Sequence, residues 1–139
     1  VDLPLAAQAG LPEQGSGERT VRLKADGSGH FVADGAINRR PVRFLVDTGA
    51  SLTTLSAKEA QRIGLRYTSG SRVRTITANG AVDGWKIELD SVRVGRVTVH
   101  DIEAVVIDTD LPVALLGMSF LDRFNMERTG STLVLRRRR

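Results

Sequence analysis

One aspartate stands out because it directly follows an apolar segment. Residues 42–46 read Val-Arg-Phe-Leu-Val, and Asp47 comes next. A buried strand that ends on a carboxylate is unusual, since an unpaired charge in an apolar environment is costly. Asp47 is therefore paired, protonated, exposed at a turn, or functional, and a carboxyl group is one of the side chains that can act as a general acid or base.

The residues after Asp47 have the types that a tight functional turn needs. Gly49 lets the backbone turn sharply, and the hydroxyls of Thr48 and Ser51 can bond to backbone or carboxylate groups. A plain Asx-type turn between two strands is the alternative interpretation. Asp-Thr-Gly alone would occur by chance in a chain of this length with a probability on the order of a few per cent. A second apolar run, which ends in Leu115-Leu116-Gly117, adds weight to the functional interpretation.

Composition and charge exclude several classes of protein. The 139 residues include no Cys, which excludes disulfides, thiol catalysis and Cys-ligated zinc. The net charge of +4 comes entirely from Arg136 to Arg139, so the body of the chain is about neutral. The six aromatic residues are scattered, and no basic face interleaved with aromatics indicates a nucleic-acid partner. No apolar run approaches the roughly 20 residues of a membrane span.

Helix signals are few. Ser56 and Glu59 fit a capping box, which predicts a helix over about 57–63 that stops at Gly64. A second helical segment is predicted over 118–124, where Phe120 and Phe124 stand one turn apart.

Short β runs dominate the remainder, so the predicted fold class is mostly β. Asn79-Gly80 between two alternating runs is the strongest hairpin signal in the chain. The predicted strands are 20–24, 42–46, 52–55, 72–78, 81–90, 91–94, 97–100, 102–107 and 132–135.

Three segments are expected along the chain. Residues 1–18 are rich in Pro, Gly and Gln without periodicity and are interpreted as a flexible linker. A short strand that pairs onto the domain is the alternative for this segment. Residues 19–136 form the domain, and 137–139 are expected to be a solvated basic tail.

Four pieces in this order resemble the retropepsin-like aspartic proteases, in particular the small bacterial single-domain members. They are the apolar run with Asp47-Thr48-Gly49-Ala50-Ser51, a helix, a hairpin turned at Asn79-Gly80, and Leu115-Leu116-Gly117 followed by Met118-Ser119-Phe120-Leu121. The resemblance covers roughly residues 20–135. It implies the acid protease fold, which is a closed, barrel-like β structure with one or two short helices and a flap hairpin.

The resemblance also implies a mechanism. A single chain supplies one Asp-Thr-Gly, so two copies in a homodimer would each contribute an Asp47 to one catalytic pair. The pair would activate a water molecule to hydrolyse the peptide bond of an extended polypeptide, with no metal ion and no other cofactor.

Further roles follow from the same resemblance. Thr48 would bond across the dimer, the Gly49 N–H would approach the carboxylate, and the Ser51 hydroxyl would bond its outer oxygen. Leu115, Leu116 and Gly117 would pack under the active-site loop. The flap residues that would contact substrate are Ala78, Asn79, Gly80 and Trp85. For Trp85, simple packing is the alternative.

Two other functions stay open at this point. The chain could be a non-enzymatic module for dimerisation or peptide binding, although such a module has no need of the aspartate. It could also be a protease that acts on itself and trims its own N-terminal linker. Bacterial relatives of this kind are often held by an N-terminal membrane segment with the protease domain in the periplasm, and a linker-like start agrees with an anchor upstream.

Overall fold

The computed structural model describes residues 19–77 and 80–138 of the chain. Seven strands form one sheet in the order β4-β5-β10-β6-β9-β8-β7, and an additional pairing of β4 with β8 closes six of them into a barrel. The outermost strand, β7, lies beyond this closure. The strands are β4 (Val32–Ile37), β5 (Arg40–Val46), β6 (Thr53–Ser56), β7 (Ser71–Thr77), β8 (Gly80–Val94), β9 (Val97–Ile107) and β10 (Ala114–Leu116). The predicted fold class is thereby confirmed.

Apolar side chains fill the inside of the barrel. Strands β8 and β9 are long and antiparallel, and Leu89 pairs with Ile102 across them. Closing a sheet removes its exposed edges and lets every strand contribute to a single core. The fully buried members of this core include Ile37, Phe44, Leu55, Leu89, Ile102 and Leu116.

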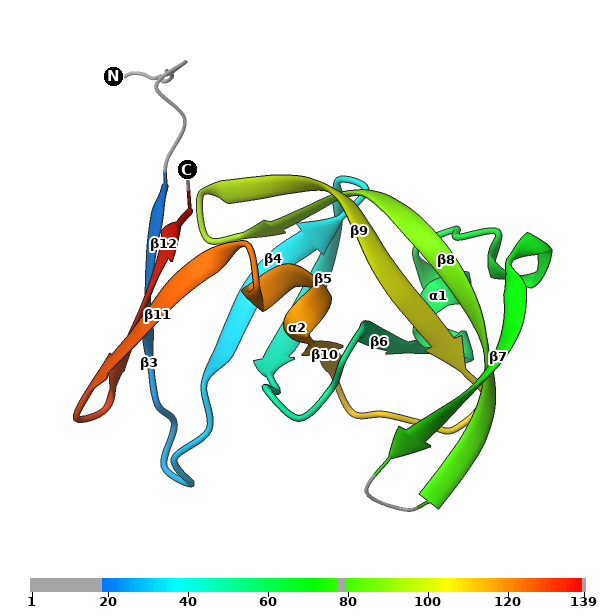
Figure 1. The fold of residues 1–139 in the computed structure, drawn as a ribbon, viewed down its shortest axis with the longest axis horizontal. Helices are drawn as coiled ribbons and strands as arrows, with labels where there is room; N and C mark the ends of the chain where they lie inside the picture. Colours follow the sequence, from blue (N-terminus) through cyan, green and yellow to red (C-terminus); the bar gives the residue numbers. More distant parts are fainter. Residues whose placement is uncertain (1–18, 78–79, 139) are drawn as a thin grey trace.

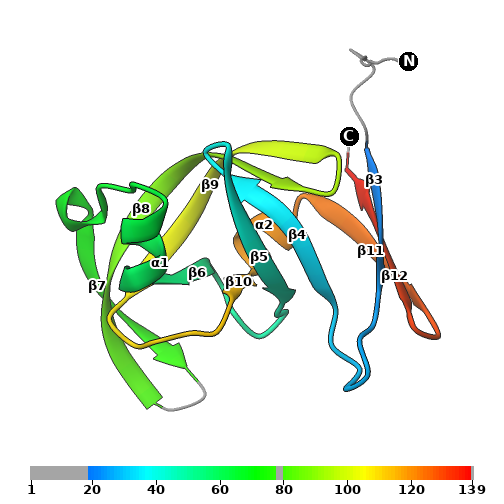
Figure 2. The ribbon, with the colours of Figure 1, turned by 180° about the vertical axis from the view of Figure 1, so that it is seen from behind.

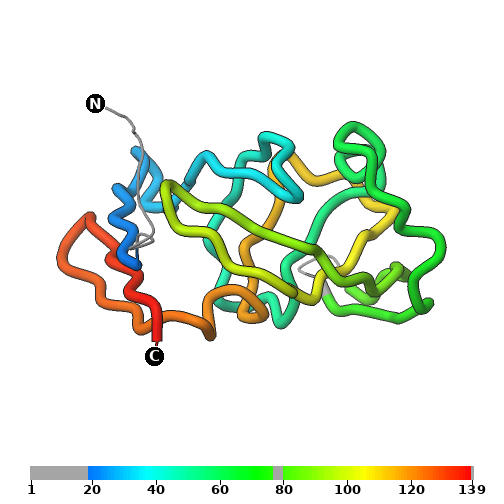
Figure 3. Tube along the Cα trace, turned by 90° about the horizontal axis from the view of Figure 1, so that it is seen from above, coloured from blue at the N-terminus to red at the C-terminus, as the bar shows by residue number. Residues whose placement is uncertain are grey.

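Strands β3 (Thr20–Lys24), β11 (Phe124–Thr129) and β12 (Thr132–Arg137) form a separate sheet in the order β11-β12-β3. Figures 1 and 2 show this sheet standing beside the barrel on the side of β4, at the end of the molecule away from β7. The view from above agrees (Figure 3). Leu133 and Leu135 of β12 are buried in the shared core.

The predicted strand pairs 81–90 with 91–94, and 97–100 with 102–107, are each one long strand, β8 and β9. Asp101 has a φ of 58° in the middle of β9, so a local bend and not a break separates its two halves. The predicted hairpin is formed by β7 and β8, with Thr77 opposite Gly80. The flap residues Ala78 and Asn79 lie outside the described residues.

The first predicted helix is present as α1 (Ala57–Arg62). The Ser56 hydroxyl accepts a hydrogen bond from the Glu59 N–H at 3.1 Å, as the capping box requires. The chain leaves the helix at Gly64, whose φ of +77° suits glycine. A single 3₁₀ turn, η1 (Tyr67–Ser69), follows.

The second predicted helix is shorter than expected, because α2 spans only Met118–Leu121. Phe124 already begins β11 and pairs with Arg137 of β12. The two rings at Phe120 and Phe124 still pack together, with centroids 4.9 Å apart. Their spacing reflects contact in the core between a helix and the strand that follows it, not a continuous helix.

The end of the chain also differs from expectation. Arg136 and Arg137 belong to β12, so the strand continues past the predicted start of the basic tail. The Arg137 guanidinium lies 5.8 Å from the centroid of the Phe124 ring. Burial and the positive charges of Arg123 and Arg19 lower its pKa from the usual arginine value. Across residues 19–77 and 80–138, none of the helices has the length and hydropathy needed to cross a bilayer.

Candidate active site

Asp47 is positioned by two parallel strands of the barrel. Leu45 and Val46 of β5 pair in register with Leu115 and Leu116 of β10. The Asp47 N–H then donates to the Leu116 carbonyl at 3.1 Å, one residue beyond the strand. The two apolar runs that the sequence analysis singled out are therefore neighbours, and together they fix the start of the Asp47 turn.

The turn itself is stabilised by two hydrogen bonds between its own residues. Gly49 donates its N–H to Asp47 Oδ1 at 2.9 Å, and the Ala50 N–H reaches the Asp47 carbonyl at 3.2 Å. A Cβ on Gly49 would lie 3.2 Å from that same carboxylate oxygen, so a side chain there would crowd the bond. Asp47 is half-buried, while Thr48 and Gly49 are exposed. This leaves one face of the turn uncovered in the single chain.

The helix α2 holds the far half of the turn. The N–H groups of Met118 and Ser119 donate to the carbonyls of Ala50 and Ser51, at 2.8 and 2.9 Å. Gly117, at the start of α2, packs so closely that a Cβ would lie 2.4 Å from the Leu52 carbonyl oxygen. Only glycine allows the approach. The absence of a side chain at Gly117 thus allows the start of α2 to pack directly against the backbone after the Asp47 turn.

Ser119 supports the site in a way that the sequence did not reveal. Its hydroxyl accepts from the Thr53 N–H at 2.9 Å and donates to the Glu103 carbonyl at 2.7 Å. It therefore joins α2, whose backbone holds the Asp47 turn, to both β6 and β9. Nothing in the residues next to Ser119 signals this task, since both partners are distant in the chain.

Ser51 does not make the contact that the resemblance implied. Its side chain is exposed, and no hydrogen bond between its hydroxyl and Asp47 occurs among the described residues. Ser51 contributes its backbone carbonyl to the turn instead. The predicted bond of Thr48 requires a second copy of the chain.

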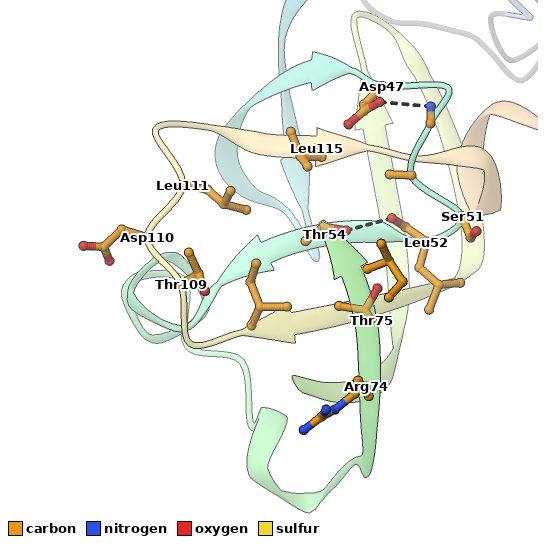
Figure 4. A pocket seen from close by; sticks show the side chains of 14 residues that line it. Asp47, Ser51, Leu52, Thr54, Arg74, Thr75, Thr109, Asp110, Leu111 and Leu115 are labelled. Atoms are coloured by element: carbon orange, nitrogen blue, oxygen red, sulfur yellow. Dashed lines mark hydrogen bonds between the residues drawn. The ribbon is translucent and has the colours of Figure 1, made fainter. Parts of the chain in front are cut away.

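A pocket of about 650 Å³ opens beside Asp47. Its size is within the range of ligand-binding pockets. Ile76 of β7 is 79% exposed and borders the same space, so a large apolar side chain faces solvent where a ligand would cover it. Figure 4 shows that the turn after β5, the strands β6, β7 and β10, and the loop before β10 contribute side chains to the pocket. The lining residues are Asp47, Gly49, Ala50, Ser51, Leu52, Thr54, Arg74, Thr75, Ile76, Ile107, Thr109, Asp110, Leu111 and Leu115.

Trp85 packs within the hairpin and does not line this pocket. Its ring meets that of Tyr67 edge-on, with centroids 5.1 Å apart, and the Arg72 guanidinium lies 4.5 Å from its centroid. These contacts occupy the ring and correct the expectation of substrate contact in favour of the packing alternative. Gly80 opens β8 next to the predicted flap turn.

The acidic and histidine side chains do not gather into a metal site. Within the part of the chain that the structure describes, no three or more such residues are placed to hold an ion.

Comparison with known proteins gives the same family as the sequence resemblance. Residues 33–123 match the family model described as "gag-polyprotein putative aspartyl protease". The crystal structure of a retropepsin-like aspartic protease from Rickettsia conorii is 34% identical and superposes with a TM-score of 0.72, covering 84% of this chain and 89% of that one. The EIAV protease in complex with an inhibitor shares the fold, at 22% identity and a TM-score of 0.53, over 66% and 84% of the two chains.

Two curated relatives are uncharacterized. One, from Rickettsia prowazekii (strain Madrid E), is 36% identical over 116 residues, which are 83% of this chain and 50% of that protein. Another, from the cobV 5′ region of Sinorhizobium sp., is 32% identical over 124 residues, or 88% and 53%. The chain spans about half the length of these curated relatives.

Proposed function

Because the chain belongs to the retropepsin-like aspartic proteases, we propose that it is an endopeptidase that hydrolyses extended polypeptides. The observation that supports this most is the position of Asp47. Its carboxyl group borders a pocket of about 650 Å³, directly after β5, in which Val42 and Phe44 are buried, and on a turn hydrogen-bonded to β10 and α2. A carboxylate held in one place next to an open pocket is suited to proton transfer.

The active unit in this proposal is a homodimer. One chain offers a single Asp-Thr-Gly, and the exposed Thr48 and Gly49 beside Asp47 leave a face for a second copy. Two Asp47 carboxyl groups brought into contact across this face cannot both ionise easily, so the pair shares one proton. The two apparent pKa values then belong to the pair and not to either residue.

Each half of the pair has its own task. The ionised carboxylate takes a proton from a water molecule held between the two groups, and the resulting oxygen attacks the scissile carbonyl carbon. The protonated carboxyl donates a hydrogen bond to the carbonyl oxygen and polarises it. As the tetrahedral intermediate collapses, the carbon–nitrogen bond breaks and the carboxyl group that took the proton from water gives it to the leaving nitrogen, so both carboxyl groups regain their starting protonation. No covalent bond to the protein forms at any stage.

The hairpin of β7 and β8 supplies the cover of the pocket. Ile76 lies over the space beside Asp47, and an extended substrate below it would exclude water from the reacting groups. An extended peptide can also add backbone hydrogen bonds to a strand edge, and β7 is the outer strand of its sheet.

The test compares wild type with Asp47→Asn, which keeps the shape of the side chain and removes its acid–base function. Both are incubated with a diverse peptide library at about pH 4 to 7, and the products are identified by mass spectrometry. The proposal expects cleavage by the wild type and none by the variant, with equal thermal stability of the two proteins. Cleavage by Asp47→Asn would reject it. Cleavage products derived only from the chain itself would indicate a self-processing protease. No cleavage products of any kind would indicate a binding module.

A further inference from the structure

We infer that Asp110 makes the pocket selective for polypeptides that carry a lysine or arginine near an apolar residue at the scissile bond. The inference rests on the proposed function and adds the class of substrate to it. It comes from the charges that line the pocket and from which of those charges are already paired.

Asp110 belongs to the loop between β9, which ends at Ile107, and β10, which begins at Ala114. Its side chain is exposed and lines the pocket together with those of Thr109 and Leu111. Figure 4 places Asp110 at the end of the pocket opposite Ser51, with its carboxylate directed outward, away from the other lining side chains. The carboxylate therefore stands at a rim, where a substrate side chain would pass it and remain in contact with water.

The charge balance of the pocket singles out this residue. Apart from Asp47, two charged side chains line the pocket, Arg74 and Asp110. The Arg74 Nε donates to Asp83 Oδ1 at 3.2 Å, so Arg74 already has a carboxylate partner on β8, which it shares with Arg72 at 3.9 Å. Asp110 forms no ion pair or hydrogen bond with any of residues 19–77 and 80–138. Of the two charged side chains that line the pocket besides Asp47, Asp110 is thus the one without a partner among the described residues.

The remainder of the pocket defines where an apolar side chain would go. The aliphatic chains of Ile76, Ile107, Leu111 and Leu115 line one continuous space between Asp47 and Asp110. A lysine or arginine can lay its methylene groups along such a surface and keep its charge at the rim. An acidic residue in the same place would meet the Asp110 carboxylate and be disfavoured. Because the rim is solvated, we expect an effect on the order of fivefold, the scale of one exposed ion pair.

The experiment uses the 139-residue chain and sets of peptides that differ only at one position, where Lys, Gln or Glu is placed in turn. Competition between the three at low ionic strength gives the relative kcat/KM for each position on both sides of the cleaved bond. The wild type is expected to prefer Lys over Gln and Gln over Glu at one position. The preference should vanish in Asp110→Asn, reverse in Asp110→Lys, and weaken at 0.5 M salt, a concentration of roughly three times the physiological value.

Asp108→Asn is the matched control. Asp108 is an exposed aspartate on the same loop and does not line the pocket. Its variant should keep the preference of the wild type. A wild type that cleaves without any charge preference, or a preference that survives in Asp110→Asn, would overturn the inference and leave the proposed function standing. A wild type that cleaves none of the peptides would contradict both the inference and the proposed function.

Discussion

The Ser119 hydroxyl accepts a hydrogen bond from the Thr53 N–H at 2.9 Å and so ties α2 to the first residue of β6. The same hydroxyl donates to the carbonyl of Glu103 on β9 at 2.7 Å. The turn that carries Asp47 therefore has a second support besides its pairing with β10. A rigid support of this kind keeps a catalytic side chain in its productive geometry.

Ser119→Ala should weaken the protein because it leaves the Thr53 N–H without its partner. The expected loss in the free energy of unfolding is about 1–3 kcal/mol, the cost of an unsatisfied buried donor. Chemical denaturation measures it. Ser69→Ala, which removes an exposed hydroxyl bonded to the Arg66 carbonyl, is the control and should cost less than about 0.5 kcal/mol. Equal losses in the two variants would contradict the role assigned to Ser119.

Gly117→Ala should be strongly destabilising, since its Cβ would lie 2.4 Å from the Leu52 carbonyl oxygen and 2.8 Å from that of Ala50. Backbone must move to relieve both contacts, so we expect a loss of more than about 2 kcal/mol together with reduced activity. Gly27→Ala is the matched control because nothing lies within 4 Å of its added Cβ. Thermal unfolding of the two variants tests the prediction, and a stable, fully active Gly117→Ala would refute it.

Ile76→Ser should lower kcat/KM without lowering stability. The side chain is 79% exposed and borders the pocket, so its apolar surface is available to a substrate and contributes little to the core. Loss of that contact is expected to cost on the order of tenfold in kcat/KM. Met126→Ser on β11 is the control, because Met126 is 40% exposed and lies outside the pocket. Steady-state kinetics on both variants decides; an unchanged kcat/KM for Ile76→Ser would count against the hairpin as the cover.

The ion pair of Glu59 with Arg62 gives a small pH-dependent term in stability. The hydrogen bonds from Arg62 lower the pKa of Glu59 below its usual value of 4.5. The pKa of this carboxyl group is lower in the folded protein than in the unfolded chain. Its contribution to stability is therefore fully present at pH values above the pKa of the unfolded chain. The contribution is lost as the pH falls through the pKa of the folded protein. Glu59→Gln should therefore be less stable than wild type at pH 7, by about 0.3–0.5 kcal/mol, and equal to it near pH 2. Urea denaturation at both pH values measures the difference, and a gap independent of pH would contradict the account.

Local signals in the sequence predicted the parts of the fold that depend on neighbours in the chain. A few consecutive residues were enough to predict each of three features: the cap of α1 at Ser56, the hairpin of β7 and β8, and the sharp turn after Asp47. The pairing of β4 with β8, which closes the barrel, joins Gly35 to Val94 and leaves no local pattern. Such long-range contacts depend on the whole core.

The candidate site was predictable to a similar extent. Asp47 was singled out by the apolar run before it, and the packing of Leu115 to Gly117 beneath it was implied by the resemblance to the retropepsin-like proteases. The placement of Trp85 against Tyr67, the anchoring by Ser119 and the position of Asp110 at the rim of the pocket were not predicted, because each depends on an element distant in the chain. Their residue types are ordinary, and only the fold gives them a role.

The central claim is that two Asp47 carboxyl groups from two copies form one catalytic pair, and a mixing experiment tests it most directly. Wild type at a fixed concentration is equilibrated with increasing amounts of Asp47→Asn, and peptide cleavage is measured after subunit exchange. Random pairing predicts that a ninefold excess of the variant reduces the activity to about a tenth, because most wild-type chains then lack a partner aspartate. Activity that stays constant across the series would show that a single Asp47 is sufficient and would contradict the account.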